Sequence, residues 1–361
     1  MTGLLPEGFH DRLPPAADAA ARLEGQVLRV ARGYGYEQVD PPLAEFADSL
    51  SRRLKAGGLQ DAVRFIDPAS QRTLAIRPDI TAQVGRIAAT RMAHHPRPVR
   101  LSYAGQVLKL GGSELRPERA LRQIGCELIG LDSVAAAREV VSVAIEALQA
   151  AGITGLSIDF ALPDLVDMLG ADPERIEVLR DRLDAKDAGG VASIDPAFLP
   201  LIEAAGPFDA ALERLRAIGN GHLKSRLDGL AEIAAAIDPA VGKTLDPTER
   251  HGFEYKTWFG FSLFAAGVRD EIGRGGSYTI LGEDGREEPA VGFSLYADPI
   301  LDAGLAGGER RRLFLPLGTP AELARALRAD GWVTVAQLDA ADTPAAQLCT
   351  HVLGPRGPEP A

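Results

Sequence analysis

The sequence predicts an α+β protein in which an antiparallel sheet is flanked by helices. Residues 99–103 and 124–128 alternate apolar and polar side chains on either side of a loop rich in glycine and proline, which indicates a long hairpin. Apolar residues recur at helical spacing in residues 15–32 and 133–150. Residues 162–240 change to a composition rich in Ala, Leu, Glu and Arg, which favours a helical insertion.

The remaining elements of this first domain, residues 1–305, follow from local signals. A short strand at 36–39 ends at a pair of prolines, and a strand at 72–77 leads into a helix that Asp79 is expected to cap. Further strands are expected after the insertion, at 253–264, 268–272 and 291–295.

The C-terminal part of the chain predicts a second, smaller unit. Residues 310–354 read as strand, helix, strand and a third strand, which is a small α/β appendage. Residues 355–361 are rich in glycine and proline, and we expect a disordered tail there.

Composition excludes several classes of protein. With 46% hydrophobic residues, the 361-residue chain can bury substantial cores. A net charge of −11 argues against a surface that binds nucleic acid through its phosphates. Cys126 and Cys349 are too few for a disulfide framework, and the chain has neither an export signal nor an apolar run of membrane-spanning length. We therefore expect a cytoplasmic protein that is not bound to a membrane.

The common signatures of nucleotide, zinc and hydrolase sites are missing from the sequence. There is no GxxxxGK[ST], no GxGxxG after a strand, no HExxH and no GxSxG. His94 and His95 are adjacent, so their rings point apart on a strand or a helix and are poorly placed to share a metal ion. We expect no metal and no cofactor.

Three polar groupings remain as candidate sites, and each has a structural alternative. Asp79 and Thr81 lie at a helix start where a ligand ammonium could meet the acid, although plain helix capping explains them as well. Gln123 and Glu127 share one strand face, which is either a binding face or simply an exposed one. Residues 273–278 are rich in glycine, which allows the close approach of a ligand or a tight turn.

Taken in order, these pieces resemble the catalytic core of class II histidyl-tRNA synthetases from Leu5 to about Leu301. The resemblance implies a class II aminoacyl-tRNA synthetase-like fold, with a six-stranded antiparallel sheet flanked by helices, and a homodimer. The motifs that carry it are Tyr34-Gly35-Tyr36-Glu37 with Pro41-Pro42, Ile76-Arg77-Pro78-Asp79-Ile80-Thr81, Gln123-Ile124-Gly125-Cys126-Glu127, His251-Gly252-Phe253-Glu254-Tyr255, Gly275-Gly276-Ser277-Tyr278 and Pro289-Ala290-Val291-Gly292-Phe293.

The sequence departs from this family where adenylation requires arginine. The second-motif arginine aligns with Lys109, and the acid two positions later aligns with Gly111. The arginine that would contact the reacting carboxylate aligns with His251, and the third-motif arginine aligns with Pro299. Because the planar guanidinium of arginine is poorly replaced at such sites, synthetase activity is expected to be lost and no catalytic residue is assigned.

The positions that face histidine in the family keep polar or aromatic groups. The resemblance implies that Asp79 takes the ammonium group of a bound histidine, that Gln123 and Glu127 lie near the imidazole, and that two tyrosines close the pocket. The candidate histidine-binding residues are Asp79, Thr81, Gln123, Glu127, Tyr255 and Tyr278.

One relative of the synthetases combines these features. Residues 103–109 and 77–81 resemble the motifs of ATP phosphoribosyltransferase regulatory subunits, which are catalytically dead. The resemblance implies a partner, the short-form catalytic subunit, in a hetero-octamer of four plus four chains. It also implies activation of that partner and feedback inhibition by L-histidine. The appendage is only about half of a synthetase anticodon-binding domain and has no basic stripe, so tRNA binding is not expected.

Two alternatives stay open. Histidine could bind at a subunit interface instead of the synthetase-like pocket. The chain could also be a divergent ligase that adenylates histidine or another small amine, with Lys109, Arg116, Arg119 or Arg122 in place of the lost arginines.

Overall fold

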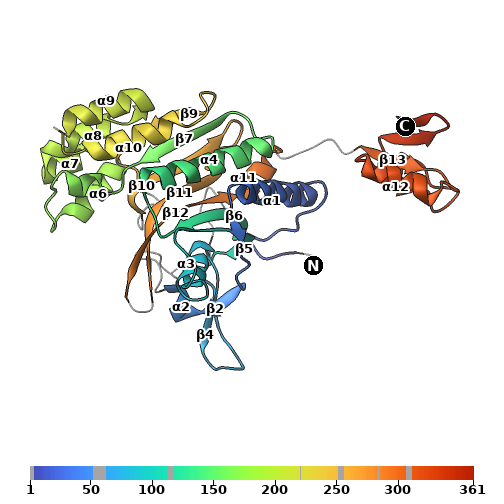
Figure 1. Ribbon diagram of the computed structural model, residues 1–361, viewed down its shortest axis with the longest axis horizontal. Coiled ribbons are helices and arrows are strands. Elements are labelled where there is room, and N and C mark those ends of the chain that lie inside the picture. The colour runs from blue at the N-terminus through green and yellow to red at the C-terminus, as the bar shows by residue number, and fades with distance from the viewer. Residues whose placement is uncertain are drawn as a thin grey trace. The chain divides into compact units, whose positions relative to one another are not determined.

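The computed structural model describes residues 4–51, 62–111, 117–219, 221–250, 256–282, 285–305 and 311–361. The chain divides into two compact units, Met1–Ala306 and Gly307–Ala361, which are treated separately (Figure 1). Among the helices of the described residues, none combines the length and apolar character needed to cross a membrane.

The larger unit is built on one sheet whose central strands are all antiparallel to their neighbours (Figure 1). The antiparallel arrangement predicted for six strands is therefore confirmed. Along the sheet these strands are β5 (Val99–Leu108), β6 (Ala120–Ile129), β12 (Glu287–Tyr296), β11 (Gly273–Leu281), β10 (Lys256–Ala265) and β7 (Leu156–Ala161).

Within the described residues the sheet is nevertheless larger than predicted, and it is mixed. It has nine strands, because β1 (Glu37–Gln38) pairs parallel with β5 at one edge. At the other edge β9 (Gly242–Leu245) pairs parallel with β7, and β8 (Gly206–Pro207) pairs antiparallel with β9. The short strand predicted at 36–39 is confirmed as β1, whereas β8 and β9 lie outside the predicted strands, because strands of two to four residues show no clear period-two pattern.

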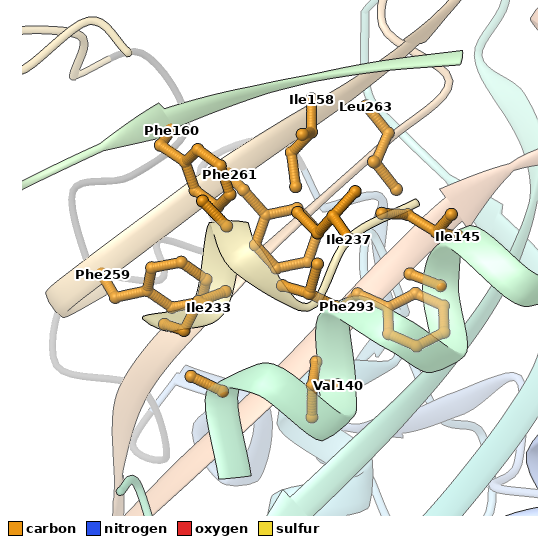
Figure 2. Close-up of a cluster of buried hydrophobic side chains, with 14 of the residues drawn as sticks. Val140, Ile145, Ile158, Phe160, Ile233, Ile237, Phe259, Phe261, Leu263 and Phe293 are labelled. Carbon is orange, nitrogen blue, oxygen red and sulfur yellow. The ribbon is translucent and has the colours of Figure 1, made fainter. Parts of the chain in front are cut away.

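One face of the sheet is covered by helices α1 (Ala16–Gly33), α4 (Val134–Ala150) and α10 (Lys224–Ala235), and it holds the main hydrophobic core. Figure 2 shows aromatic and aliphatic side chains of β7, β10 and β12 meeting side chains from α4 and from α10 and the residues just after it. The helices follow from apolar residues at helical spacing, such as Leu23 and Val27 in α1, which are 3% and 0% exposed.

The opposite face of the sheet is partly covered by helix α3 (Thr81–Ala89). Ile80 and Val84 pack there against Leu101 of β5 and Ile280 of β11 in a second hydrophobic cluster. Beside α3 lie the short helix α2 (Ala47–Ser51) and a small antiparallel sheet of β2 (Ala44–Phe46), β4 (Thr73–Ile76) and β3 (Arg64–Ile66).

The stretch from 162 to 240 is mainly helical in its described residues, and its helices gather at one end of the larger unit (Figure 1). Before α10 it contains a 3₁₀ turn at Pro196–Phe198 and, in chain order, α5 (Leu165–Met168), α6 (Ile176–Asp184), α7 (Ala188–Ile194), α8 (Leu199–Glu203) and α9 (Phe208–Ile218).

One predicted strand and one structural alternative in the second half of this unit are wrong. Residues 268–272, expected as a strand, form an irregular, bent segment after the turn at 266–267, where Gly267 has a φ of +84°. The glycine-rich residues 273–278 do not form the tight turn that was the structural alternative, because they are the first six residues of β11. Gly276 has a φ of +144°, and a Cβ there would overlap the Phe259 carbonyl oxygen of β10. The glycine run therefore fits a close strand contact.

The smaller unit contains β13 (Arg312–Leu315), α12 (Ala321–Ala329), β14 (Val333–Ala336), β15 (His351–Gly354) and β16 (Gly357–Pro360), in the sheet order β14-β13-β15-β16. The disordered tail predicted at 355–361 is wrong, because Gly357–Pro360 pairs antiparallel with β15. Pro355 and Arg356 form the two-residue turn that reverses the chain, and the returning strand recovers backbone hydrogen bonds that composition alone does not reveal.

Candidate ligand-binding site

The candidate site lies on the face of the sheet opposite the main core. Gln123 and Glu127 both project to this face from β6, since Ile124 and Cys126 pack in the core on the other side. Gln123 is 0% exposed and Glu127 is 1% exposed. The alternative of an exposed polar sheet face is therefore wrong, and buried polar groups of this kind require hydrogen-bond partners.

Two tyrosine hydroxyl groups donate to the buried Glu127 carboxylate. The Tyr103 hydroxyl lies 3.1 Å from Glu127 Oε1, and the Tyr278 hydroxyl lies 2.5 Å from Oε2. Gly292 is directly opposite Glu127 on β12, and a Cβ there would overlap the carboxylate. The missing side chain at Gly292 therefore makes the space in which this carboxylate sits.

Burial keeps Tyr103 in its protonated, donating form. Its pKa is raised well above the ordinary tyrosine value, first because its hydroxyl is desolvated and then because the carboxylates of Glu127 and Asp79 are near. The tyrosine therefore remains a hydrogen-bond donor to Glu127 throughout the physiological pH range.

Asp79 and Gln123 form the other end of the same network. Gln123 Nε2 donates to Asp79 Oδ2 at 2.8 Å, and Gln123 Oε1 accepts the backbone N–H of Ile80 at 2.9 Å. Asp79 Oδ1 accepts the backbone N–H of Thr81 at 2.7 Å. One carboxylate oxygen thus caps the first turn of α3, while the other is oriented by Gln123.

Thr81 joins the two ends of the network, because its Oγ1 lies 3.2 Å from the Tyr103 hydroxyl. The structure therefore brings five of the six candidate residues together, from α3, β6, β11 and the segment before α3. The sixth, Tyr255, lies outside the described residues, as does His251.

Arg77 is not part of this network, although it is only two residues from Asp79. Its guanidinium is buried and donates to the carbonyl oxygens of Gln106 at 2.8 Å and Pro41 at 2.7 Å. Burial lowers its pKa, although Asp40 and Glu45 oppose that shift. Arg77 therefore fastens the strand before α3 to β5.

Sequence reasoning missed Tyr103 and Ser294. Ser294 Oγ lies 2.7 Å from Gln123 Nε2 and 2.9 Å from the Tyr103 hydroxyl. Tyr103 fits an ordinary strand pattern, and Ser294 is 191 positions away from it in the chain. The glycines Gly125 and Gly292 are the only local signal, because they mark places where a neighbouring side chain crosses the sheet.

The degenerate third-motif position opens onto a cleft that suits phosphate poorly. Pro299 of α11 (Ala297–Asp302) lines a cavity of about 310 Å³ whose lining holds four acidic residues and one arginine, namely Glu118, Asp270, Asp298, Asp302 and Arg269. Burial raises the pKa of Asp302 above the ordinary aspartate value; the charges of Arg12 and His10 oppose that shift, and the carboxylates of Asp298 and Glu118 add to it. Several carboxylates around one cleft would repel the phosphates of ATP.

The second-motif positions likewise offer no guanidinium. Lys109 continues β5, where its backbone N–H donates to the Arg119 carbonyl oxygen at 2.9 Å and its side chain is half-buried. Gly111 is exposed and has no side chain with which to hold a metal or a phosphate. Arg116, one proposed substitute, lies outside the described residues.

The fold and this site define a protein of the histidyl-tRNA synthetase class. The family model described as Histidyl-tRNA synthetase matches residues 8–300. A solved structure described as an ATP phosphoribosyltransferase regulatory subunit/histidyl-tRNA synthetase, from Bacillus halodurans C, superposes with a TM-score of 0.78 at 22% identity, covering 96% of each chain. A chain of the ATP phosphoribosyl transferase (HisG:HisZ) complex from Thermotoga maritima has a TM-score of 0.58 at 18% identity, covering 77% of this chain and 97% of that one.

The curated relatives narrow this class. The ATP phosphoribosyltransferase regulatory subunit of Paramagnetospirillum magneticum is 43% identical over 370 aligned residues, which cover 98% of this chain and 97% of the relative. The chain belongs to the family of ATP phosphoribosyltransferase regulatory subunits. Its role is therefore regulatory, in histidine biosynthesis, and it is not a catalyst.

Proposed function

We propose that this chain binds L-histidine on the polar face of its sheet and passes that signal to the catalytic subunit of ATP phosphoribosyltransferase. The observation that carries the proposal is the pair of carboxylates, Asp79 and Glu127, held in one hydrogen-bond network. An amino acid with a cationic ammonium group and a ring N–H matches two acceptors of this kind.

Asp79 is the proposed acceptor for the ligand ammonium group. It is half-buried, whereas Gln123 and Glu127 are buried, so its carboxylate is the more accessible one. Both Gln123 amide hydrogens already have partners, Asp79 and Ser294. We therefore assign Gln123 to the ammonium end of the site, where it orients Asp79. This differs from the family resemblance, which implies that Gln123 lies near the imidazole.

Glu127 is the proposed acceptor for the imidazole N–H. Its carboxylate already accepts the hydroxyl groups of Tyr103 and Tyr278, so it serves as a hydrogen-bond acceptor on this face of the sheet. Tyr103 and Tyr278 hold the carboxylate in place, and Thr81 completes the wall next to α3. We keep Tyr255 as a further pocket residue on the strength of the family motif alone.

The proposed partner is the short-form catalytic subunit, in a hetero-octamer of four plus four chains built around a self-dimer of this one. The regulatory family supports the catalytic partner, while the four-plus-four octamer and the self-dimer rest on the family resemblance alone. The net charge of −11 supports the absence of a tRNA partner. We also propose a cytoplasmic location, with which two unpaired, buried cysteines agree.

Histidine can act only through its different affinities for the active and inhibited assemblies. Shifting a balanced equilibrium to about 99% inhibition requires about 3 kcal/mol of coupling free energy, which several subunits can share. It is therefore not necessary for any single contact in the site to supply the whole coupling free energy.

The first test is the ATP phosphoribosylation rate of the catalytic subunit, with and without this chain, each with and without L-histidine. We expect stimulation by the chain and inhibition by histidine only in its presence. No change in either rate would contradict the proposal. Native mass spectrometry of the mixture checks the octamer.

The second test locates the histidine site by isosteric variants, with L-histidine binding followed by calorimetry. Glu127→Gln and Asp79→Asn should each weaken binding by roughly tenfold to a hundredfold, because each removes a charged acceptor. Matched controls are Glu146→Gln, whose carboxylate also accepts a tyrosine hydroxyl, and Asp238→Asn, which also accepts a glutamine amide and a backbone N–H. If all four variants bind and respond to histidine like the wild type, the sensor lies elsewhere, and a subunit interface is favoured.

A further inference from the structure

Ser294 of β12 lies between the two ends of the proposed histidine site, and no motif assigns it a role. It is 7% exposed. Its hydroxyl oxygen accepts from Gln123 Nε2 at 2.7 Å and lies 2.9 Å from the Tyr103 hydroxyl. Gln123 belongs to the ammonium end and Tyr103 to the ring end, so this one hydroxyl contacts both.

The contact between Ser294 and Tyr103 depends on a glycine between them. Tyr103, Gly125 and Ser294 lie directly opposite one another on β5, β6 and β12. A Cβ at Gly125 would overlap the Tyr103 hydroxyl, so only glycine lets the tyrosine ring cross β6 to reach β12. The sheet is therefore shaped to allow this hydrogen bond.

The direction of the hydrogen bonds follows from the available protons. Gln123 N–H donates to Ser294, and the single Tyr103 proton is donated to Glu127. The serine proton is therefore donated to the Tyr103 oxygen, and the chain runs from Gln123 through Ser294 and Tyr103 to the Glu127 carboxylate. Linked hydrogen bonds of one direction polarise and strengthen one another.

We propose that Ser294 is a positioning residue that couples recognition of the ligand ammonium group to recognition of its ring. It holds Gln123 so that the amide orients Asp79, and it holds Tyr103 so that the hydroxyl orients Glu127. The proposal rests on the proposed function, because it concerns the same site. Thr81 also contacts the Tyr103 oxygen, so loss of Ser294 leaves that second contact and gives a graded effect.

The experiment measures two discrimination ratios by calorimetry on the full chain. The first is the Kd of imidazolepropionate, which lacks the ammonium group, divided by the Kd of L-histidine. The second is the Kd of β-thienylalanine, which lacks the ring N–H, divided by the Kd of L-histidine. In Ser294→Ala we expect both ratios to fall by about threefold to tenfold, because one hydroxyl orients both acceptors.

Three further variants separate this role from others. Asp79→Asn should lower only the first ratio, and Glu127→Gln only the second. Ser277→Ala removes another fully buried serine hydroxyl, which instead binds Thr257 and the backbone N–H groups of Trp258 and Phe259, and both ratios should stay at the wild-type values.

The possible failures can be told apart. If Asp79→Asn and Glu127→Gln respond as expected but Ser294→Ala weakens all three ligands equally, the serine is merely structural and the inference is overturned. If the wild-type chain binds none of the ligands, or if Asp79→Asn and Glu127→Gln leave the ratios unchanged, the proposed histidine site itself is wrong and the inference is overturned with it.

Discussion

The hydroxyl of Tyr278 on β11 donates to Glu127 Oε2 on β6 at 2.5 Å, across the whole width of the intervening strand β12. This reach is possible because Gly292 on β12 leaves space for the carboxylate. The tyrosine and the glutamate are 151 positions apart in the chain. The buried carboxylate of Glu127, in the motif at 123–127, is therefore held by the hydroxyl of Tyr278, in the motif at 275–278.

Tyr278→Phe should weaken L-histidine binding by about fivefold, because it removes one of the two hydroxyl groups that orient Glu127, a loss of about 1 kcal/mol. Calorimetry measures the change. Tyr34→Phe is the control, since its hydroxyl also donates to a glutamate, Glu146, at 2.6 Å, but at the end of α1 on the other face of the sheet. Equal affinities for wild type and Tyr278→Phe would argue against the assigned ring end.

Gly292→Ala should destabilise the fold by about 1–3 kcal/mol and abolish measurable histidine binding, because the new methyl group would displace the Glu127 carboxylate. Urea denaturation and calorimetry check the two effects. Gly33→Ala adds the same atom at a place with no heavy atom within 4 Å of the new Cβ, and it should do neither. Normal binding by Gly292→Ala would show that the carboxylate can move without loss of function.

Histidine-dependent exchange of labelled pyrophosphate into ATP should be undetectable with this chain, alone or with the catalytic subunit. The reason is electrostatic, since the cleft that Pro299 lines holds four acidic residues against the single arginine Arg269, where adenylation would need a net positive charge. Pro299→Arg should not restore the exchange, because the new cation would be neutralised by those acids. Exchange above background would instead support the divergent ligase.

Two aspartates, Asp159 and Asp67, should contribute to the pH dependence of folding stability with opposite signs. Burial raises the pKa of Asp159, with Asp246 adding to the shift, while the bond from Thr244 and the charge of Lys186 oppose it. Because the folded pKa exceeds the unfolded one, folding stability falls as pH rises through that window. Asp159→Asn should therefore gain stability relative to wild type as the pH rises above the ordinary aspartate pKa, as measured by urea denaturation.

Asp67 provides the opposite case. Hydrogen bonds from Ser70 and from the backbone N–H of Ala69 lower its pKa, so its contribution to stability is lost as pH falls through its folded pKa. Asp67→Asn should lose stability relative to wild type at pH 7 and approach it in acid. If Asp159→Asn and Asp67→Asn change the free energy of unfolding in the same direction at pH 7, the opposite pKa shifts assigned to these two aspartates are contradicted.

The sequence by itself determined the elements with strong periodicity and the faces of their side chains. Apolar spacing places α1, α3 and α4, and alternation on β6 puts Gln123 and Glu127 on one face. The reason is that periods of 3.6 and 2 are local properties of the backbone, readable from neighbouring residues alone. The motif series also identified the class, because its residues occur in a fixed order along the chain.

Only the tertiary structure decided what those side chains meet. Ser294 reaches Tyr103, and Tyr278 reaches Glu127, because the sheet order sets β5, β6, β12 and β11 side by side in a particular register. The edge strands β8 and β9 and the paired C-terminal tail arise in the same way. Register and strand order minimise the free energy of the whole sheet, so no local window of sequence contains them.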